Sequence, residues 1–299
     1  MTHTELKTIR DFIRYATSQF NKAGIYYGHG TDNAWDEAVA LVLHTAGLKH
    51  DVNHAVLDAN LISEERSKLF ELIEKRAKDR IPVPYLTNEA WFLEQPFYVD
   101  ERVLIPRSPI AELIENQFSP FIEEEQVQRI LDLCTGSGCI AIGCAQAFPD
   151  ANVDASDISS DALIVANINV LKHHVEDQVT LHQSDLFNNL PQKKYDIIVS
   201  NPPYVSIEEM AALPNEYKHE PALGLVAGTD GLDLAKRILR NAPNYLQPHG
   251  ILIVEVGNSE VALAEQYPDV PFTWLEFERG GGGVFLLTAE QLAEHKGRF

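Results

Sequence analysis

The stretch Ile130-Leu-Asp-Leu-Cys-Thr-Gly-Ser-Gly138 joins a short apolar run to a helical pattern that begins at about Gly138. Glycines at such a junction let the backbone pass close to a ligand, because they have no side chain in the way. The exposed amides at a helix N-terminus favour an electron-rich group. The junction therefore predicts a ligand-binding loop at the carboxyl end of a buried strand.

The same alternation of apolar run and helical stretch continues after this loop. A strand over 153–157 precedes a helix over 160–172, and the runs 195–200 and 251–255 predict further strands. This order predicts an α/β fold whose mostly parallel sheet is covered on both faces. Two late strands, 272–277 and 284–287, are too close in sequence for a crossover helix, so we expect an antiparallel hairpin at one sheet edge.

The first eighty or so residues have helical rather than alternating character. Apolar residues from Leu6 to Phe20 are spaced three and four apart, which is typical of one helix face. Asn33 and Ser63 are candidate N-caps of two further helices. Extended, aromatic-rich sequence follows the prolines at 82 and 84, with turn-prone Gln95-Pro96. We therefore predict a helical substrate-binding domain over 1–85, a linker with a β-hairpin over 86–108, and a sheet domain over 109–299.

Composition excludes several classes of protein. The 299 residues are 45% hydrophobic and carry a net charge of −20, so the chain is globular, repels nucleic-acid phosphates and suits a basic protein partner. Cys134, Cys139 and Cys144 lack the spacing of a zinc site or a disulfide framework, and we expect no metal. Because no signal peptide or membrane-spanning run is recognisable, we expect a soluble, cytoplasmic protein without a membrane partner.

Two acidic residues follow strands of the predicted sheet. Asp157 ends the second strand and can accept hydrogen bonds from both hydroxyls of a ribose. Asp185 ends the third and could accept one from an adenine amino group. Both residues suit any adenosine-bearing cofactor, and Gly136-Ser-Gly-Cys-Ile-Ala141 also fits the dinucleotide pattern G-x-G-x-x-A. A nicotinamide-dependent oxidoreductase therefore remains possible at this point.

The tetrapeptide Asn201-Pro202-Pro203-Tyr204 directly follows the fourth strand. The prolines fix the backbone, so the Pro202 carbonyl and the Asn201 side-chain oxygen form two convergent acceptors beside the flat face of Tyr204. Such a loop can hold a planar NH₂ group by both hydrogens. Orientation of its nitrogen towards an electrophilic methyl group would then supply catalysis.

Together these motifs resemble the S-adenosylmethionine-dependent class I methyltransferases that methylate planar nitrogens. The resemblance implies a Rossmann-like sheet and S-adenosyl-L-methionine as cofactor. It implies a catalytic loop formed by Asn201, Pro202, Pro203 and Tyr204. The cofactor-binding residues that it implies are Asp132, Cys134, Thr135, Gly136, Ser137, Gly138, Asp157, Asp185, Leu186 and Asn201.

Further motifs are similar to the glutamine-modifying branches of that family. The helical domain, Val103-Leu-Ile-Pro-Arg107 and Glu255-Val-Gly257 fit both branches, whereas Arg107-Ser-Pro-Ile-Ala-Glu112 departs from the release-factor pattern and resembles the ribosomal protein L3 branch. This implies N5-methylation of a glutamine in the basic protein L3, with no direct DNA contact and RNA involved only through ribosome assembly. The alternatives are methylation of release factors, an amino-methylating nucleic-acid enzyme, an NAD-dependent oxidoreductase and a non-enzymatic ribosome assembly factor.

Overall fold

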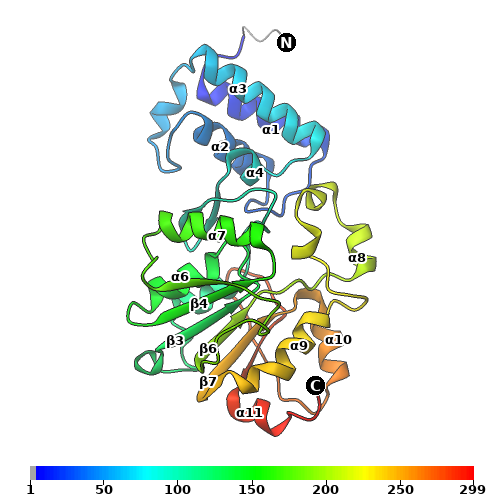
Figure 1. Ribbon diagram of the computed structural model, residues 1–299. Coiled ribbons are helices and arrows are strands. Elements are labelled where there is room, and N and C mark those ends of the chain that lie inside the picture. The colour runs from blue at the N-terminus through cyan, green and yellow to red at the C-terminus, as the bar shows by residue number, and fades with distance from the viewer. Residues whose placement is uncertain (1–4) are drawn as a thin grey trace. The chain divides into compact units, whose positions relative to one another are not determined.

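A computed structural model describes residues 5–299, which divide into two compact units. One unit contains the chain up to Ala90 together with Val99–Glu101 and Pro214–His219. The other contains Trp91–Tyr98, Arg102–Leu213 and Glu220–Phe299. The first is helical and the second contains the large sheet (Figure 1).

The helical unit packs its helices around one apolar core. Its main elements are α1 (Ile9–Ala23), α2 (Ala34–Thr45), η1 (His54–Asp58), α3 (Ser63–Glu74), η2 (Lys75–Asp79) and α4 (Val83–Thr87). Phe12, Phe20, Leu41 and Leu69 are fully buried in this core. Asn33 caps α2 as predicted, because its side-chain oxygen accepts the backbone N–H groups of the first turn.

The start of α3 differs from the prediction. Ser63 is the first helical residue, and the cap position belongs to Ile62. The side chain of Glu65 accepts the Ile62 N–H at 2.8 Å, while the Ser63 hydroxyl accepts a hydrogen bond from Arg66. The prediction of Ser63 as the N-cap is therefore wrong by one residue. Glu65, inside the helix, accepts the Ile62 N–H, so the helix starts without a capping serine side chain.

A buried ion cluster lies in the helical unit. The Arg76 side chain is fully buried and makes two hydrogen bonds to the Glu37 carboxylate, at 3.1 and 3.2 Å. Oε1 of Glu216 lies 3.4 Å from both Arg76 and Arg80 and accepts the Tyr26 N–H at 2.9 Å. Glu216 belongs to η4 (Asn215–His219), a segment that lies between the sheet-unit segments in the sequence. This segment thus completes the charge pairing of the helical unit.

The sheet unit contains seven strands in the order β5-β4-β3-β6-β7-β9-β8. Their bounds are β3 (Arg129–Leu133), β4 (Asn152–Asp157), β5 (Val179–Gln183), β6 (Tyr195–Ser200), β7 (Leu246–Glu255), β8 (Thr273–Trp274) and β9 (Val284–Thr288). The first five strands of that order are parallel, whereas β9 pairs antiparallel with both β7 and β8. The prediction of a mostly parallel, Rossmann-like sheet with an antiparallel edge hairpin is confirmed.

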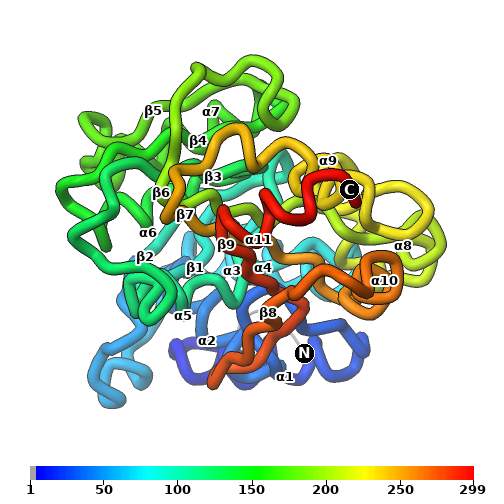
Figure 2. The backbone as a smooth tube through the Cα atoms, turned by 90° about the horizontal axis from the view of Figure 1, so that it is seen from below, coloured from blue at the N-terminus to red at the C-terminus, as the bar shows by residue number. Residues whose placement is uncertain are grey.

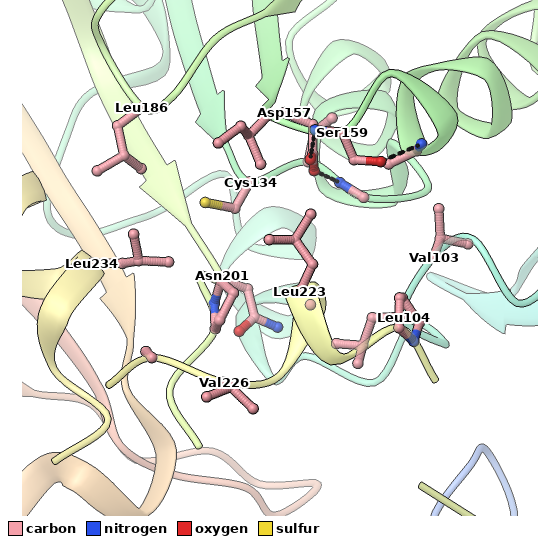
Figure 3. A pocket seen from close by; sticks show the side chains of 18 of the residues that line it. Val103, Leu104, Cys134, Asp157, Ser159, Leu186, Asn201, Leu223, Val226 and Leu234 are labelled. Atoms are coloured by element: carbon pink, nitrogen blue, oxygen red, sulfur yellow. Dashed lines mark hydrogen bonds between the residues drawn. The ribbon is translucent and has the colours of Figure 1, made fainter. Parts of the chain in front are cut away.

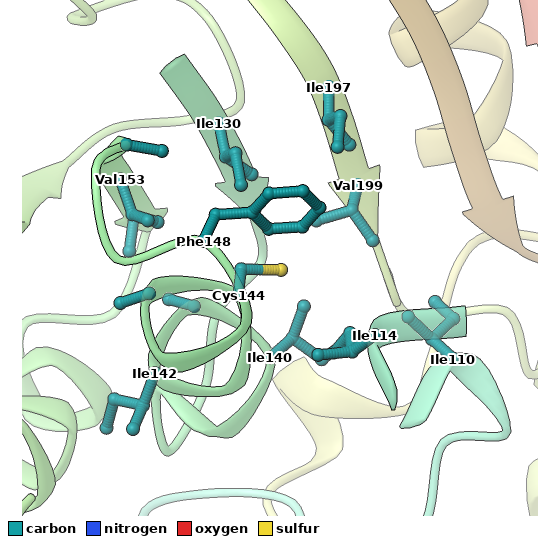
Figure 4. Close-up of a cluster of buried hydrophobic side chains, with 14 of the residues drawn as sticks. Ile110, Ile114, Ile130, Ile140, Ile142, Cys144, Phe148, Val153, Ile197 and Val199 are labelled. Atoms are coloured by element: carbon teal, nitrogen blue, oxygen red, sulfur yellow. The ribbon is translucent and has the colours of Figure 1, made fainter. Parts of the chain in front are cut away.

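Alternate residues of the central strands face two separate cores. Ile197 and Val199 of β6 join Ile110 and Cys144 in one core, on the side of α5 (Ile110–Glu115) and α6 (Cys139–Ala147), as Figure 4 shows. Ile198 between them joins the other core with residues of α9 (Asp233–Asn241) and α11 (Ala289–Glu294). The sheet is thus buried on both faces, which explains its continuous apolar runs.

The remaining elements of the sheet unit flank these layers. They are α7 (Ser160–Lys172), α8 (Ile207–Ala212), α10 (Glu260–Gln266) and the short η3 (Glu124–Gln126), η5 (Ala222–Gly224), η6 (Ala242–Asn244) and η7 (Gly257–Ser259). The C-terminal Phe299 lies beside α9 (Figure 2), where its backbone oxygen accepts the Nε–H of Arg240 at 3.3 Å.

A two-stranded sheet precedes the large one. It consists of β1 (Ala90–Phe92) and β2 (Gln95–Phe97). The turn lies at Leu93 and Glu94, both with positive φ, and not at Gln95-Pro96 as the sequence suggested. Pro96 can belong to β2 because an edge strand leaves one row of backbone groups unpaired.

Candidate active site

A cavity of about 650 Å³ lies in the sheet unit and takes residues from the loops that follow β3, β4, β5 and β6. Figure 3 shows Cys134, Asp157, Leu186 and Asn201 around it. The predicted residues in its lining are Cys134, Thr135, Gly136, Ser137, Asp157, Asp185, Leu186, Asn201 and Pro203. Asp132, Gly138, Pro202 and Tyr204 are outside the lining. The parallel sheet therefore brings most of the predicted residues together, at the position where such sheets bind ligands.

Backbone conformation shapes the loop that follows β3. Gly136 has a φ of +55° and open space where a side chain would project. Gly138 has a φ of +82° and is the N-cap of α6. Cys134 and, after β5, Leu186 also have positive φ, which is uncommon for residues with a side chain. Both line the cavity, so these two strained backbone positions lie where a ligand would bind.

Asp157 is central to the hydrogen bonding of this region. Its Oδ2 accepts the Gly136 N–H at 2.9 Å and its Oδ1 accepts the Ser159 N–H at 2.9 Å (Figure 3). Burial raises the pKa of the Asp157 carboxyl, while these backbone donors act in the opposite direction. A carboxylate that faces the cavity is thus already fixed in orientation by the loop next to it.

Asp132 supports the binding loop from behind. It is fully buried, and its Oδ2 accepts the Thr135 hydroxyl at 2.5 Å and the Ala141 N–H at 3.2 Å. Burial raises the pKa of the Asp132 carboxyl to about 7. Within residues 5–299, its Oδ1 is a buried atom without a hydrogen-bond partner. The structure thus places Asp132 under the loop, and its contacts hold Thr135 and the first turn of α6.

Asp185 also lines the cavity and has a cationic neighbour. Arg237 of α9 donates to its Oδ2 at 2.7 Å, and the Asn188 amide donates to the same oxygen at 3.2 Å. Lys236 and Arg240 of α9 also line the cavity, and Lys236 pairs with Asp230 at 2.6 Å. Sequence reasoning missed these cations, although Lys236-Arg237 and Arg240 are rare basic residues in an acidic chain.

The loop after β6 presents two of its four residues to the cavity. Asn201 and Pro203 are in the lining, and Figure 3 shows the Asn201 side chain among the residues that surround the cavity. We expected Tyr204 to offer a flat face to the ligand. Instead its hydroxyl donates to Oε1 of Glu255 at 3.0 Å, and its ring lies against Gly257. Its observed contacts brace the loop from outside the cavity lining.

The segment Arg102–Ser108 forms another wall of the cavity. Glu220, whose side chain is fully buried, holds it with three hydrogen bonds: from the Ile105 N–H at 3.0 Å and from Arg107 at 2.6 and 2.8 Å. In the sequence, Arg107 stood out only as part of the motif Val103-Leu-Ile-Pro-Arg107. Glu220 likewise stood out only through a motif, His219-Glu-Pro221, and its pairing with Arg107 could not be predicted because the two residues are 113 apart in the sequence.

All three cysteines are free thiols, and Cys134 and Cys139 line the cavity. Burial raises the pKa of the Cys139 thiol to about 12, so it is protonated at neutral pH. Among residues 5–299, no three His, Cys, Asp or Glu side chains are grouped to hold a metal ion. No helix in the same range is long and apolar enough to cross a membrane.

Comparisons with known proteins first identify the class. Residues 116–214 match the family described as the methyltransferase small domain. The crystal structure of the hMettl16 catalytic domain in complex with MAT2A 3′UTR hairpin 6 resembles this fold with a TM-score of 0.52 and 17% identity, over 79% of this chain and 85% of that one. The likeness to that structure shows a shared fold, and the family match identifies residues 116–214 as a methyltransferase domain.

Relatives of much higher identity then identify the family. The ribosomal protein uL3 glutamine methyltransferase of Francisella tularensis is 51% identical over 98% of this chain and 94% of its own length. Its namesake in Neisseria gonorrhoeae is 53% identical over 96% of both chains. The chain belongs to the ribosomal protein uL3 glutamine methyltransferase family, which confirms the resemblance inferred from the motifs.

Proposed function

We propose that this enzyme transfers the methyl group of S-adenosyl-L-methionine to the side-chain amide nitrogen, N5, of a glutamine in ribosomal protein uL3. The observation that carries the proposal is the position of Asn201 and Pro203 in the same cavity as Asp157 and Gly136. An amide-holding loop and an adenosine-binding loop thus share one space. Family membership supports the choice of uL3 as substrate, and a cytoplasmic location follows as part of the same proposal.

The cavity residues fit the proposed cofactor. The cavity volume of about 650 Å³ lies within the usual range of cofactor sites. Gly136 leaves open space for a close ligand, and the Asp157 carboxylate can accept the ribose hydroxyls. The N-terminus of α6, with Cys139 and Ile140 in the lining, favours the carboxylate of the methionine portion. When bound, S-adenosylmethionine supplies an electrophilic methyl group on a positively charged sulfur.

The loop after β6 supplies the acceptors for the amide. The side-chain oxygen of Asn201, which lines the cavity, would hold one amide hydrogen, and the backbone carbonyl of Pro202, the next residue of the loop although outside the lining, would hold the other. Because the prolines cannot relax easily, little reorganisation is needed when charge builds up on the nitrogen during attack. A bound S-adenosylmethionine would supply the methyl group, and the loop after β6 would hold the amide nitrogen towards it while the displaced amide proton is released to water.

Charge supports a basic protein as substrate. Residues 1–90 contain 11 Lys and Arg and 13 Asp and Glu, so nearly all of the net charge of −20 lies on residues 91–299. A strongly acidic catalytic unit attracts a basic ribosomal protein and repels nucleic-acid backbones. The charge therefore disfavours the amino-methylating nucleic-acid enzyme among the alternatives.

Methyl transfer from labelled S-adenosylmethionine tests the proposal. The purified enzyme is incubated separately with uL3, a release factor, DNA and RNA, and labelled products are mapped by mass spectrometry. The proposal expects label on one glutamine of uL3 and no label on the release factor, the DNA or the RNA. Label only on the release factor or on nucleic acid would support those alternatives. Binding of uL3 without any transfer would favour an assembly factor, and binding of NAD instead of S-adenosylmethionine would favour an oxidoreductase.

A further inference from the structure

Glu255 joins two walls of the cavity from behind. It is the last residue of β7, and it is 4% exposed. The Ser108 hydroxyl donates to its Oε2 at 2.5 Å, and the Tyr204 hydroxyl donates to its Oε1 at 3.0 Å. Ser108 belongs to the wall formed by Arg102–Ser108, and Tyr204 ends the loop that carries Asn201. One carboxylate therefore fixes the segments on which both walls depend.

Tyr204 packs so closely against two neighbouring residues, Gly257 and Gly231, that neither position has room for a side chain. A Cβ at Gly257 would lie 2.6 Å from the Tyr204 ring, and a Cβ at Gly231 would lie 2.2 Å from the Tyr204 carbonyl oxygen. The Ser259 hydroxyl shares its proton between that same oxygen, at 3.3 Å, and the Asp230 carbonyl oxygen, at 3.1 Å. The backbone, the ring and the hydroxyl of Tyr204 are thus each held by a different group. A side chain held at several points in this way is expected where a functional site needs a fixed geometry.

The chemistry of Glu255 also favours a role in geometry over a role in stability. Burial of a carboxylate is costly, and an apolar side chain of similar size would fill the same space at lower cost. Burial raises the pKa of Glu255, while its two hydroxyl donors and the charge of Arg107 act in the opposite direction. What an apolar residue could not provide is a fixed distance between two hydroxyl groups on two different segments.

We propose that Glu255 is a positioning residue for amide methylation, acting through Tyr204 on Asn201 and through Ser108 on the opposite wall. The inference rests on the proposed function, because positioning is defined relative to the glutamine amide. Pro202 and Pro203 transmit the restraint, since their fixed φ angles couple the position of Tyr204 to that of Asn201. Loss of the Glu255 contacts should therefore misplace the acceptors of the amide while leaving the Asp157 side of the cavity intact.

Four variants test the inference in the full-length enzyme. Tyr204→Phe removes one hydroxyl and keeps the ring, Ser108→Ala removes the other, and Glu255→Ala removes the carboxylate. Asp196→Asn is the matched control, because Asp196 is also a buried acid (3% exposed) but accepts hydrogen bonds from the backbone of Gln128 and Arg129 outside the cavity. The readouts are single-turnover methylation of uL3, the dissociation constant of S-adenosylmethionine, and amide hydrogen exchange over 200–206.

The expected pattern separates positioning from stability. Tyr204→Phe and Glu255→Ala should each slow single-turnover methylation by about 10- to 100-fold, as misplacement of reacting groups by roughly 1 Å does. S-adenosylmethionine affinity should stay within about twofold, because its contacts are elsewhere. Ser108→Ala should give a smaller loss of the same kind. The double variant Tyr204→Phe/Glu255→Ala should be no slower than Glu255→Ala alone, because both changes break one shared hydrogen bond.

Several results would overturn the inference. The inference is wrong if the rate losses of the two single changes multiply in the double variant. It is also wrong if Asp196→Asn loses as much rate as Glu255→Ala, or if the variants lose cofactor affinity and keep their methylation rate. If Glu255→Ala fails to fold, Tyr204→Phe alone decides, because a normal rate there removes the proposed route. Hydrogen exchange does not depend on the substrate: unchanged protection of 200–206 in Glu255→Ala refutes the restraint, whereas faster exchange without uL3 methylation by the wild type refutes the proposed function.

Discussion

The backbone N–H of Gly136 donates to Oδ2 of Asp157 over 2.9 Å and so joins the loop after β3 to the end of β4. The other oxygen of the same carboxylate accepts the Ser159 N–H. Each carboxylate oxygen has two lone pairs, so both can accept a ribose hydroxyl without releasing the backbone. The residue proposed for the cofactor therefore also shapes the loop beside it.

Replacing Asp157 by alanine should weaken S-adenosylmethionine binding by about 10- to 150-fold, the equivalent of ~1.5–3 kcal/mol for one charge-assisted hydrogen bond. The loss combines a missing acceptor with a loosened Gly136. Isothermal titration calorimetry measures it directly. Asp161→Ala is the control, because Asp161 is exposed on the first turn of α7 and outside the cavity lining. Equal affinity of the Asp157 variant and the wild type would assign the ribose to another residue.

Replacing Asn201 by alanine should lower the rate of methyl transfer by about 10²- to 10³-fold, which is typical for loss of one preorganised group that stabilises the transition state. Cofactor affinity should be close to normal, because Asp157 and Gly136, the residues proposed to hold the adenosine portion, are unchanged in this variant. Single-turnover kinetics at saturating S-adenosylmethionine give the rate. Asn167→Ala, at an exposed position on α7, should behave as the wild type. A near-normal rate for Asn201→Ala would refute the assigned role.

A Cβ added at Gly257 should disturb the catalytic loop. Gly257 has a φ of +48°, and its added Cβ would lie 2.6 Å from the Tyr204 ring. We expect Gly257→Ala to slow methylation and to lower the free energy of unfolding by about 1–3 kcal/mol, the range for overpacking. Urea unfolding and single-turnover rates measure the two effects. Gly282→Ala is the matched control, since nothing lies within 4 Å of its added Cβ and its φ is ordinary. Equal methylation rates and equal free energies of unfolding for the two variants would contradict the close packing of Tyr204 against Gly257.

The parts of the site that follow directly from strand ends could be predicted. Gly136, Asp157, Asp185 and Asn201 each come just after an apolar run, and parallel strands carry their carboxyl ends to one edge of a sheet. Position along the chain was therefore sufficient to place these residues in one cavity. It was not sufficient to orient Tyr204, because a strand end fixes the course of the backbone and not the direction of each side chain that follows.

The buried acids could not be predicted in the same way. Glu220 meets Arg107 across 113 residues, and Glu216 meets Arg76 across 140. No local period or cap links such pairs, since only the tertiary fold brings them together. The three-residue segment Val99–Glu101 and the six residues from Pro214 also pack with the helical unit, although sheet-unit residues flank both in sequence. Domain limits drawn from composition are contiguous and miss such segments.

Removing the buried Arg76 should destabilise the helical unit. In Arg76→Met, the buried carboxylate of Glu37 loses the cation that pairs with it, whereas Glu216 keeps its contact with Arg80. Breaking a buried pair on one side costs about 3–5 kcal/mol, because the remaining charge is uncompensated. Urea unfolding followed by circular dichroism measures the loss. Arg14→Met, an exposed arginine of α1, is the control and should change stability by less than about 0.5 kcal/mol. A similarly small loss for Arg76→Met would show that the cluster is not a main source of stability.

Asp132 should make stability fall as the pH rises. Burial raises its pKa from 3.8 to about 7 in the folded chain, so the folded state holds a proton that the unfolded state has released. The stabilisation from this proton is complete below the unfolded pKa and is lost as the pH passes from about 4 to 7, with a slope of at most ~1.4 kcal/mol per pH unit. Asp132→Asn cannot ionise.

Urea unfolding at several pH values from 4.5 to 8 isolates this contribution. The free energy of unfolding of the wild type minus that of Asp132→Asn should decrease up to about pH 7 and be constant above it, because only the wild type titrates at this position. The same difference taken with Asp150→Asn, at an exposed loop position, should stay flat throughout. A difference for Asp132→Asn that is flat over this range, or that increases with pH, would show that the buried carboxyl ionises without cost and that its contacts with Thr135 and Ala141 outweigh burial.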